Sequence, residues 1–214
     1  MENPILPTAA APAKKFLAVG VLPAGLQNYY TREAFRVIQP FAAEVAAMTG
    51  AEYSVYDTAT AIDAGLCHFH VGYLCDKELT ETEQQGYIVQ KLSFVDQAAR
   101  AAVASAGTPE AKKAAIAAAN AADWAGRASD FAGYFLLKMQ NPERDALHIW
   151  QVYIVKELRG RMEVFDPGFE QVKNAAGLFK AKVITMAGSY EQWHGVAERL
   201  GFMQGPTIYR MPVK

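Results

Sequence analysis

The first regular pattern in the chain is an apolar run from Phe16 to Leu22, which turn residues close. A short apolar run bounded in this way predicts a buried strand. From Thr31 to Met48 apolar residues recur every three or four positions, which predicts a helix with a kink or a break at Pro40. Leu66 to Leu74 predicts a second strand. Residues 1–15, rich in Ala and Pro without periodicity, predict a flexible tail.

The pattern changes at about residue 79, where two alanine-rich segments follow each other. They run from Thr80 to Ala106 and from Thr108 to Ala128, with Gly107 between them. Gly is typical of a helix end, and Thr, Pro and Glu in sequence are typical of a helix start, so we predict a helical hairpin inserted at about 79–128. Alanine buries little area per residue. The hairpin is therefore either an insertion that lies against the domain or a surface that packs on another subunit.

Strands and helices alternate in the last third of the chain. The predicted strands are Tyr134–Met139, Leu147–Val155, Lys182–Met186 and Thr207–Met211, and the predicted helices are Phe169–Phe179 and Tyr190–Leu200. This order restricts the fold to the α/β or α+β class. With the tail set aside, we expect residues 16–214 to form a single domain that carries the hairpin.

Composition excludes several classes of function. The chain has 214 residues, a formal net charge of -1, 51% hydrophobic and 20% charged residues, which is typical of a globular domain. No run of Lys and Arg indicates a nucleic-acid partner, and no apolar stretch reaches the roughly 18 residues that a membrane span needs. The N-terminus lacks the pattern of a secretory signal. The two cysteines, Cys67 and Cys75, are expected to be buried thiols.

One segment has the features of a phosphate site. In YIVKELRGR, from Tyr153 to Arg161, a strand ends, the chain turns at Arg159 and Gly160, and a helix follows. The free N–H groups and the dipole of a helix start attract anions. Corners of this kind often contain Arg-Gly for structural reasons, so the segment alone does not establish a site.

The sequence also resembles the GNAT superfamily of N-acyltransferases, over residues from about 130 to 214. IWQVYIVKELRGR resembles the fourth strand and pyrophosphate loop, KVITMAGS the fifth strand, YEQWHGVAERLGF the next helix and GPTIYRM the last strand. The helix that contains Trp193 is especially similar to GNAT-like proteins encoded by bacteriophages, some of which are virion components. The resemblance implies a mixed central sheet flanked by helices.

The resemblance also implies a cofactor, acetyl-CoA. Strands four and five would splay apart to admit its pantetheine arm, and the loop after strand four would hold its pyrophosphate. The matching positions are Val152, Ile154 and Val155 for the arm, and Arg159, Gly160 and Arg161 for the phosphates.

This chain departs from the family pattern at three places. Two positions that are small in the family fall on Met162 and Val164, whose side chains would shield the backbone from a pyrophosphate. Asp166 and Pro167 predict a late helix start, at which the carboxylate would repel phosphate. The tyrosine that protonates the leaving thiolate in the family falls at Ala197. Together these changes predict that the corner has lost its cofactor.

The remaining candidates for chemistry are histidines and one tyrosine. By the two-residue strand period, His148 shares a face with Val152 and is a candidate base. Tyr190 is a poor replacement for the missing thiolate acid, because it lies two helical turns before Ala197. His68 and His70 share a strand face, but no third ligand has the spacing of a metal site, so none is expected.

Three functions follow as alternatives. The first, which the departures favour, is a degenerate GNAT-like protein without catalysis, with an assembly role as in phage virions. Its hairpin and tail would then bind protein partners or a second copy. The second is an active acyl-CoA-dependent N-acyltransferase, and the third is a small-molecule binding module. The cofactor is accordingly none or acetyl-CoA, and the location cytoplasmic or virion-associated.

Overall fold

A seven-stranded mixed sheet organises the chain, in the order β1-β2-β3-β4-β5-β7-β6. The computed structural model describes residues 16–21, 36, 39–41, 44–45, 55–140, 145–187, 191–204 and 208–212. The strands are β1 (Phe16–Val21), β2 (His68–Cys75), β3 (Phe131–Gln140), β4 (Ala146–Ile154), β5 (Val183–Ala187), β6 (Met203–Gln204) and β7 (Ile208–Pro212). Neighbouring strands are antiparallel except β4 and β5, which are parallel.

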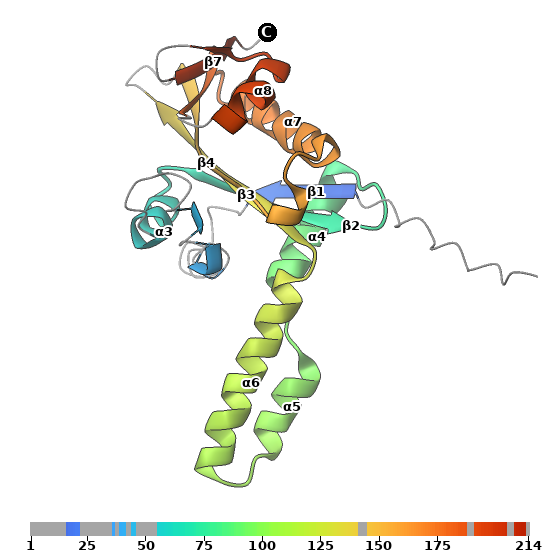
Figure 1. Cartoon of the computed structure of the whole chain (residues 1–214). Coiled ribbons are helices and arrows are strands. Elements are labelled where there is room, and N and C mark those ends of the chain that lie inside the picture. The colour runs from blue at the N-terminus through green and yellow to red at the C-terminus, as the bar shows by residue number, and fades with distance from the viewer. Residues whose placement is uncertain are drawn as a thin grey trace, which may run out of the picture.

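Helices cover both faces of this sheet, as Figure 1 shows. They are the 3-10 turn η2 (Gln39–Phe41), α3 (Val55–Asp63), α4 (Glu81–Leu92), α5 (Gln97–Ser105), α6 (Pro109–Ala128), the 3-10 turn η3 (Lys156–Leu158), α7 (Met162–Leu178) and α8 (Glu191–Arg199). One core cluster lies under α7 and α8 and contains Leu137, Leu147 and Ile184, all fully buried. The other, on the opposite face, contains Phe69, Tyr73 and Ile88. Successive side chains along a strand point to opposite faces of the sheet, so neighbouring residues of one strand belong to different clusters.

Two of the helical predictions need correction. The sequence pattern does not predict helix α3. The long helix expected from Thr80 to Ala106 is two helices, because the Asp96 side chain accepts a hydrogen bond from the Ala99 amide at 2.9 Å and caps α5 as a new start. Of the helix expected over 31–48, the 3-10 turn around Pro40 is described, and the tail 1–15 lies outside the described residues.

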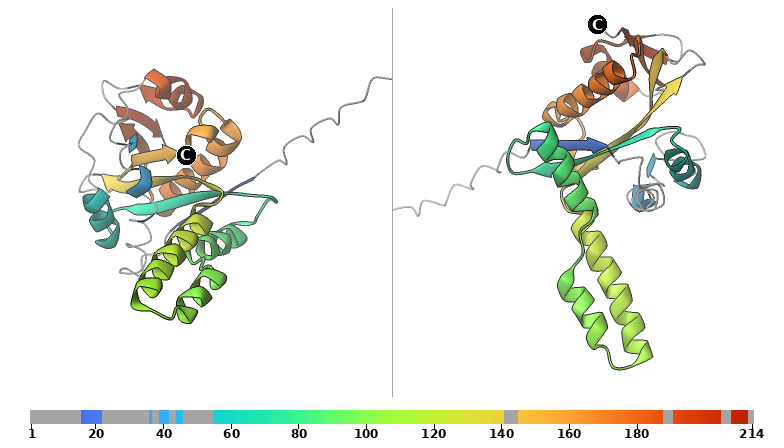
Figure 2. Two further views of the ribbon diagram at one scale, coloured as in Figure 1. Left: turned by 60° about the horizontal axis from the view of Figure 1, so that its bottom comes forward. Right: turned by 180° about the vertical axis from the view of Figure 1, so that it is seen from behind.

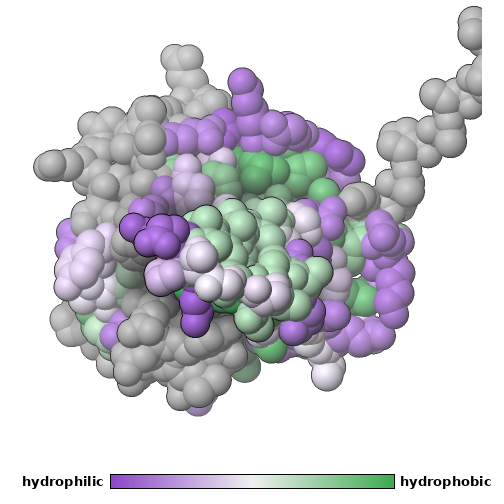
Figure 3. All heavy atoms as spheres, turned by 90° about the horizontal axis from the view of Figure 1, so that it is seen from below, coloured by the Kyte–Doolittle hydropathy of each residue, from purple (hydrophilic) through white to green (hydrophobic). Residues whose placement is uncertain are grey.

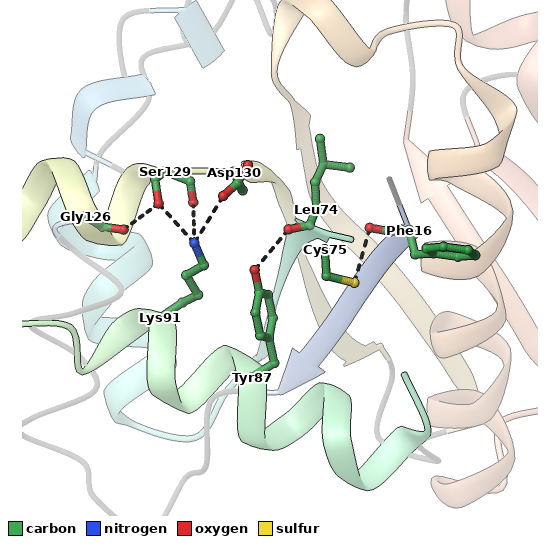
Figure 4. Close-up of polar contacts among 8 residues, drawn as sticks. All are labelled: Phe16, Leu74, Cys75, Tyr87, Lys91, Gly126, Ser129 and Asp130. Atoms are coloured by element: carbon green, nitrogen blue, oxygen red, sulfur yellow. Dashed lines mark hydrogen bonds and ion pairs between the residues drawn. The ribbon is translucent and has the colours of Figure 1, made fainter. Parts of the chain in front are cut away.

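Helix α4 and the end of α6 are fastened to each other and to the sheet (Figure 4). The Lys91 ammonium donates to the Ser129 carbonyl and hydroxyl at 3.3 and 3.0 Å and lies 3.2 Å from the Asp130 carboxylate. The Tyr87 hydroxyl donates to the Leu74 carbonyl at 3.1 Å. These contacts make α4 part of the body of the domain.

Helices α5 and α6, which we call the hairpin, project away from this body in both views (Figures 1 and 2). Within the two helices the buried residues are Ala119, Asp123 and Arg127, and all three lie in α6. Seen from the end of the hairpin, pale apolar surface occupies the middle of the molecule with hydrophilic residues around it (Figure 3). The hairpin therefore does not lie against the domain. No helix in the described part of the chain has the length and hydrophobicity to cross a membrane.

Candidate functional site

Strands β4 and β5 pair over only part of their length. Their register runs from Ala146 opposite Val183 to Ile149 opposite Met186, and β4 then continues to Ile154. Beyond Ile149 the edge of β4 that faces β5 has no paired strand among the described residues. The pairing of β4 with β5 therefore ends five residues before β4 does.

A β-bulge lies at the point where the two strands separate. In the β3–β4 register, Leu136 is opposite Gln151 and Leu137 is opposite Ile149, which leaves Trp150 as an extra residue. As a result Val152 packs on the cluster under α7, whereas Trp150 packs on the other face. The expectation that His148 and Val152 share a face is therefore wrong, because the bulge shifts the alternation by one residue.

The open edge of β4 presents main-chain groups of two predicted residues. The Val155 amide donates to the Ala132 carbonyl at 3.0 Å, so it faces β3. Main-chain groups alternate between the edges of an antiparallel strand. The main-chain groups of Val152 and Ile154 consequently point toward the open side. Those of Val155 point toward β3 instead.

An apolar pocket lies beside this edge, between the sheet, α7 and α8. It is narrow, with a cavity volume of about 80 Å³. Val152 and Ile154 line it from β4, Phe169 and Val172 from α7, and Met186 from β5. With almost entirely apolar walls and an opening to solvent, it suits an elongated ligand that is mostly apolar.

The predicted phosphate loop leads from this pocket to the start of α7. Leu158, 5% exposed, anchors the loop, and the Arg161 amide donates to the Leu158 carbonyl at 3.2 Å. Gly160 has φ +80, which favours glycine, and a side chain there would meet nothing within 4 Å. Helix α7 begins at Met162 with Arg161 as its N-cap, and no side chain caps it. Its first N–H groups thus keep the capacity to bind an anion.

The predicted late helix start is wrong. Because α7 already begins at Met162, Asp166 and Pro167 lie in its second turn, and no carboxylate occupies the N-cap. Pro167 there removes one hydrogen bond, to the Glu163 carbonyl, at a cost the packed helix tolerates. Met162 and Val164 consequently lie in the first turn of the helix rather than before it.

Both arginines of the loop contact carboxylates. The Arg159 guanidinium pairs with Glu44 and donates from Nε to the Ile154 carbonyl at 2.9 Å. Arg161 Nε donates to Glu163 Oε1 at 2.8 Å. Arg159 therefore occupies one of the main-chain acceptors on the open edge of β4.

Glu44 and Tyr153 complete this arrangement, and sequence reasoning missed both. The Tyr153 hydroxyl donates to Glu44 Oε2 at 2.9 Å across 109 residues of sequence. Hydrogen bonds from Arg159 and then Tyr153 lower the pKa of Glu44. Burial, and then the Glu44 carboxylate, raise the pKa of Tyr153. No local pattern links residues this far apart.

Comparison with known proteins identifies the architecture. No protein-family model matches the chain, and no curated protein sequence matches it. The solved structure of Tetrahymena GCN5 matches with a TM-score of 0.50 and 6% identity, over 92% of this chain and 96% of that one. A putative GNAT-family acetyltransferase from Desulfovibrio desulfuricans matches with a TM-score of 0.47 and 11% identity, over 92% of this chain and 99% of that one. An acetyltransferase from Thermus thermophilus matches with a TM-score of 0.47 and 13% identity, over 92% of this chain and 97% of that one.

The chain has a GNAT-like fold. Identities this low establish the fold alone, and they add nothing to the expected likeness to phage proteins.

Two positions in this GNAT-like fold bear on catalysis. His148 is 6% exposed, its Nδ1 lies 2.9 Å from Thr185 Oγ1, and burial, with a contribution from Lys138, lowers its pKa to about 4. It is neutral at pH 7 and a weak base. Ala197 is fully buried in α8 and has no proton to donate. Tyr190 lies outside the described residues.

The strand histidines have a packing role. The His68 ring lies 4.5 Å from that of Phe179, and the His70 ring stacks 4.5 Å from that of Phe135. No group of three His, Cys, Asp or Glu side chains within the described ranges can hold a metal ion. Cys67 and Cys75 are buried free thiols, as predicted.

Proposed function

We propose that the chain binds an acyl-CoA in the apolar pocket and transfers the acyl group to an amine. The observation that carries this proposal is the end of β4–β5 pairing at Ile149, which opens a pocket along the remaining residues of β4. The arm would lie along the main chain of Val152 and Ile154. Its apolar surroundings would exclude water from the thioester.

The loop would hold the phosphates once its arginines are released. The side chains of Arg159 and Glu44 are 35% and 40% exposed, and those of Arg161 and Glu163 are 50% and 55% exposed. Exposed pairs of this kind contribute only about 0–1 kcal/mol. A pyrophosphate, with more charge and more acceptor oxygens than a carboxylate, can displace the carboxylate partners.

The residues present favour transfer by positioning. The amine nitrogen would attack the thioester carbon, forming a C–N bond as the C–S bond breaks and the thiolate leaves. Ala197 offers the thiolate no proton, and a histidine with a pKa of about 4 removes the amine proton poorly. The proton lost by the amine and the proton gained by the thiolate would therefore be exchanged with solvent at the open end of the pocket. Holding two reactants in line supplies much of an enzyme's acceleration even without acid or base. His148 lies on the other face of β4 from Val152, so it is not proposed as the base of this step.

Titration calorimetry with acetyl-CoA tests the proposal. We expect micromolar binding by the wild type and at least tenfold weaker binding by Arg159→Glu, because the substitution places a negative charge beside the phosphates. Lys112→Glu, an equal charge change on the exposed hairpin, serves as the control. Absence of binding to the wild type at millimolar acetyl-CoA would contradict the proposal.

A second candidate is a non-catalytic GNAT-like protein with an assembly role. The fully buried Ala197 and the projecting hairpin favour it, since the hairpin offers a surface for a protein partner or a second copy. This candidate requires no CoA binding and a native mass above that of one chain. A small-molecule binding module, the third alternative, would instead bind apolar ligands in the pocket without preference for CoA.

A further inference from the structure

Polar side chains lie at the separation of β4 and β5 on the face of the sheet away from α7 and α8. Helix α3 is on this side of the sheet, as Figure 1 shows. His148, hydrogen-bonded to Thr185, lies one residue before the pairing ends, and Trp150 is the first residue after it. Because Trp150 is the extra residue of the bulge, it packs on this face, against the core cluster of Phe69 and Tyr73. A molecule that approaches the separation from this side meets these groups first.

The Lys138 ammonium lies over the ring of this tryptophan. Lys138 is opposite His148 in the register of β3 and β4, and its Nζ lies 4.6 Å from the centroid of the Trp150 ring. The side chain therefore reaches diagonally from β3 to the point at which β4 separates from β5. A tryptophan ring attracts a cation through its face, which fixes the position of the ammonium here.

The charge of Lys138 has no carboxylate partner. Its contact with the Trp150 ring is its only interaction within the described ranges, so its three N–H donors find no oxygen there. Burial lowers the pKa of His148 and raises that of Cys67, and the next contribution to both is the charge of Lys138, which lowers them. No carboxylate of the described residues contributes to either pKa. The side chain is half-buried, so the ammonium stays within reach of a ligand.

A second polar group beside the separation lacks a partner. Gln151 Nε2 donates to Thr58 Oγ1 of α3 in a long hydrogen bond of 3.4 Å. Gln151 Oε1 is buried and accepts no hydrogen bond from the described part of the chain. Buried acceptors without a partner are few in native proteins. An N–H donor of a bound molecule would satisfy this oxygen.

We propose that Lys138 selects an acceptor that carries a carboxylate as well as its amine, as a free amino acid does. This inference rests on the proposed function and names the class of its acceptor. The carboxylate pairs with the Lys138 ammonium, the apolar part of the acceptor lies against Trp150, and the amine lies at the separation of the strands. A single ammonium matches the single charge of a carboxylate, and hydrogen bonds between two charged groups are stronger than neutral ones.

Acetyl transfer from acetyl-CoA to leucine and to leucinamide, which differ only at the carboxylate, tests this assignment. We expect the ratio of kcat/KM for leucine to that for leucinamide to fall at least about fivefold in Lys138→Met, which keeps the length of the side chain and loses its charge. The reactivity of each amine is the same for every variant, so it cancels in this comparison. Lys138→Arg keeps the charge and should stay within twofold of the wild-type ratio. Lys112→Met, on the exposed hairpin, should do the same, and circular dichroism checks the fold of each variant.

Binding of N-acetyl-leucine, measured by titration calorimetry without acetyl-CoA, separates this inference from the proposed function. We expect Lys138→Met to bind it at least about fivefold more weakly than the wild type, and N-acetyl-leucinamide to bind weakly to both. If no acetyl group is transferred to either amine but this dependence on Lys138 holds, the proposed function fails and the carboxylate site remains. Equal ratios of kcat/KM in the wild type and in Lys138→Met would overturn the assignment. So would a wild type that neither transfers the acetyl group nor binds N-acetyl-leucine.

Discussion

At the residue scale, Gly133 shows how closely the backbones pack beside the apolar pocket. A Cβ at this position would lie 2.2 Å from the Tyr153 carbonyl oxygen, which belongs to β4 and cannot move alone. We expect Gly133→Ala to lower the free energy of unfolding by about 2–3 kcal/mol. Gly86→Ala in α4, where a Cβ meets nothing within 4 Å, should be neutral or stabilising by up to about 1 kcal/mol. Urea denaturation measures both, and equal effects would contradict the packing argument.

In the proposed acyl-CoA site, Glu44 would compete with the phosphates for Arg159. The substitution Glu44→Gln removes the carboxylate charge that pairs with the Arg159 guanidinium. We expect acetyl-CoA to bind two- to fivefold more tightly, which corresponds to the about 0.5–1 kcal/mol that an exposed ion pair contributes. Glu157→Gln, an equal change on the exposed turn η3, provides the control. Weaker binding by Glu44→Gln would show that the carboxylate instead supports the loop.

Two buried histidines make stability depend on pH. Burial, and then the nearby charge of Lys138, lower the pKa of His148 to about 4. Burial, and then charge repulsion from His68, lower the pKa of His70 to about 3. The unfolded chain therefore binds protons below about pH 6.5 while the folded chain does not, so stability present at pH 7 is lost as the pH falls. Each histidine contributes a slope of up to about 1.4 kcal/mol per pH unit. His148→Gln, measured by urea denaturation at pH 7 and pH 5, should show a smaller difference than the wild type.

At the element scale, the sequence predicts most strands to within a few residues but not the irregularities that shape the site. The apolar runs of β1, β2 and β4 appear directly in the pattern. The bulge at Trp150 does not, because β4 carries no glycine or proline there. The sequence predicts the start of α7 too late because Asp166 and Pro167 form a strong local start signal, which the tertiary position of the helix overrides.

Substitutions in the first turn of α7 test whether the side chains of Met162 and Val164 shield the proposed phosphate site. We expect the double substitution Met162→Gly and Val164→Gly to tighten acetyl-CoA binding at least tenfold, because it exposes the helix amides. The free energy of unfolding should fall by about 1–2 kcal/mol, the ordinary effect of two glycines in a helix. Leu178→Gly, at the 83% exposed end of the same helix, should weaken the fold without tightening binding. Unchanged affinity in the double variant would mean that another feature prevents binding.

At the scale of the whole molecule, the resemblance predicts the GNAT-like core, and the rest depends on contacts between distant segments. Glu44 and Arg159 are 115 residues apart in sequence, and Arg36 and Arg127 meet at a cleft that neither local pattern indicates. Helical periodicity predicts the hairpin but not its direction. That direction follows from α4, which packs on β1 and β2 and leaves α5 and α6 to extend beyond the sheet.

The projecting hairpin gives the last prediction, on the association of chains. Ala114, Ala118 and Ala121 are exposed and lie on one face of α6. If this face packs on a second copy, wild-type protein sediments above the mass of one chain. Glutamate at all three positions would then bring like charges into the contact and return the protein to the mass of a single chain.

The fold of the hairpin itself serves as the control for this experiment. Exposed glutamates on a helix should change the free energy of unfolding by less than about 0.5 kcal/mol. Glutamate at the fully buried Ala119 should instead destabilise the hairpin by several kcal/mol, because it places a charge at a position that is closed to water. A triple variant that stays folded and loses association would assign the face to a contact between copies. Wild-type protein at the mass of one chain over the whole concentration range would contradict that assignment. The alanine face would then not be a contact between copies of the chain.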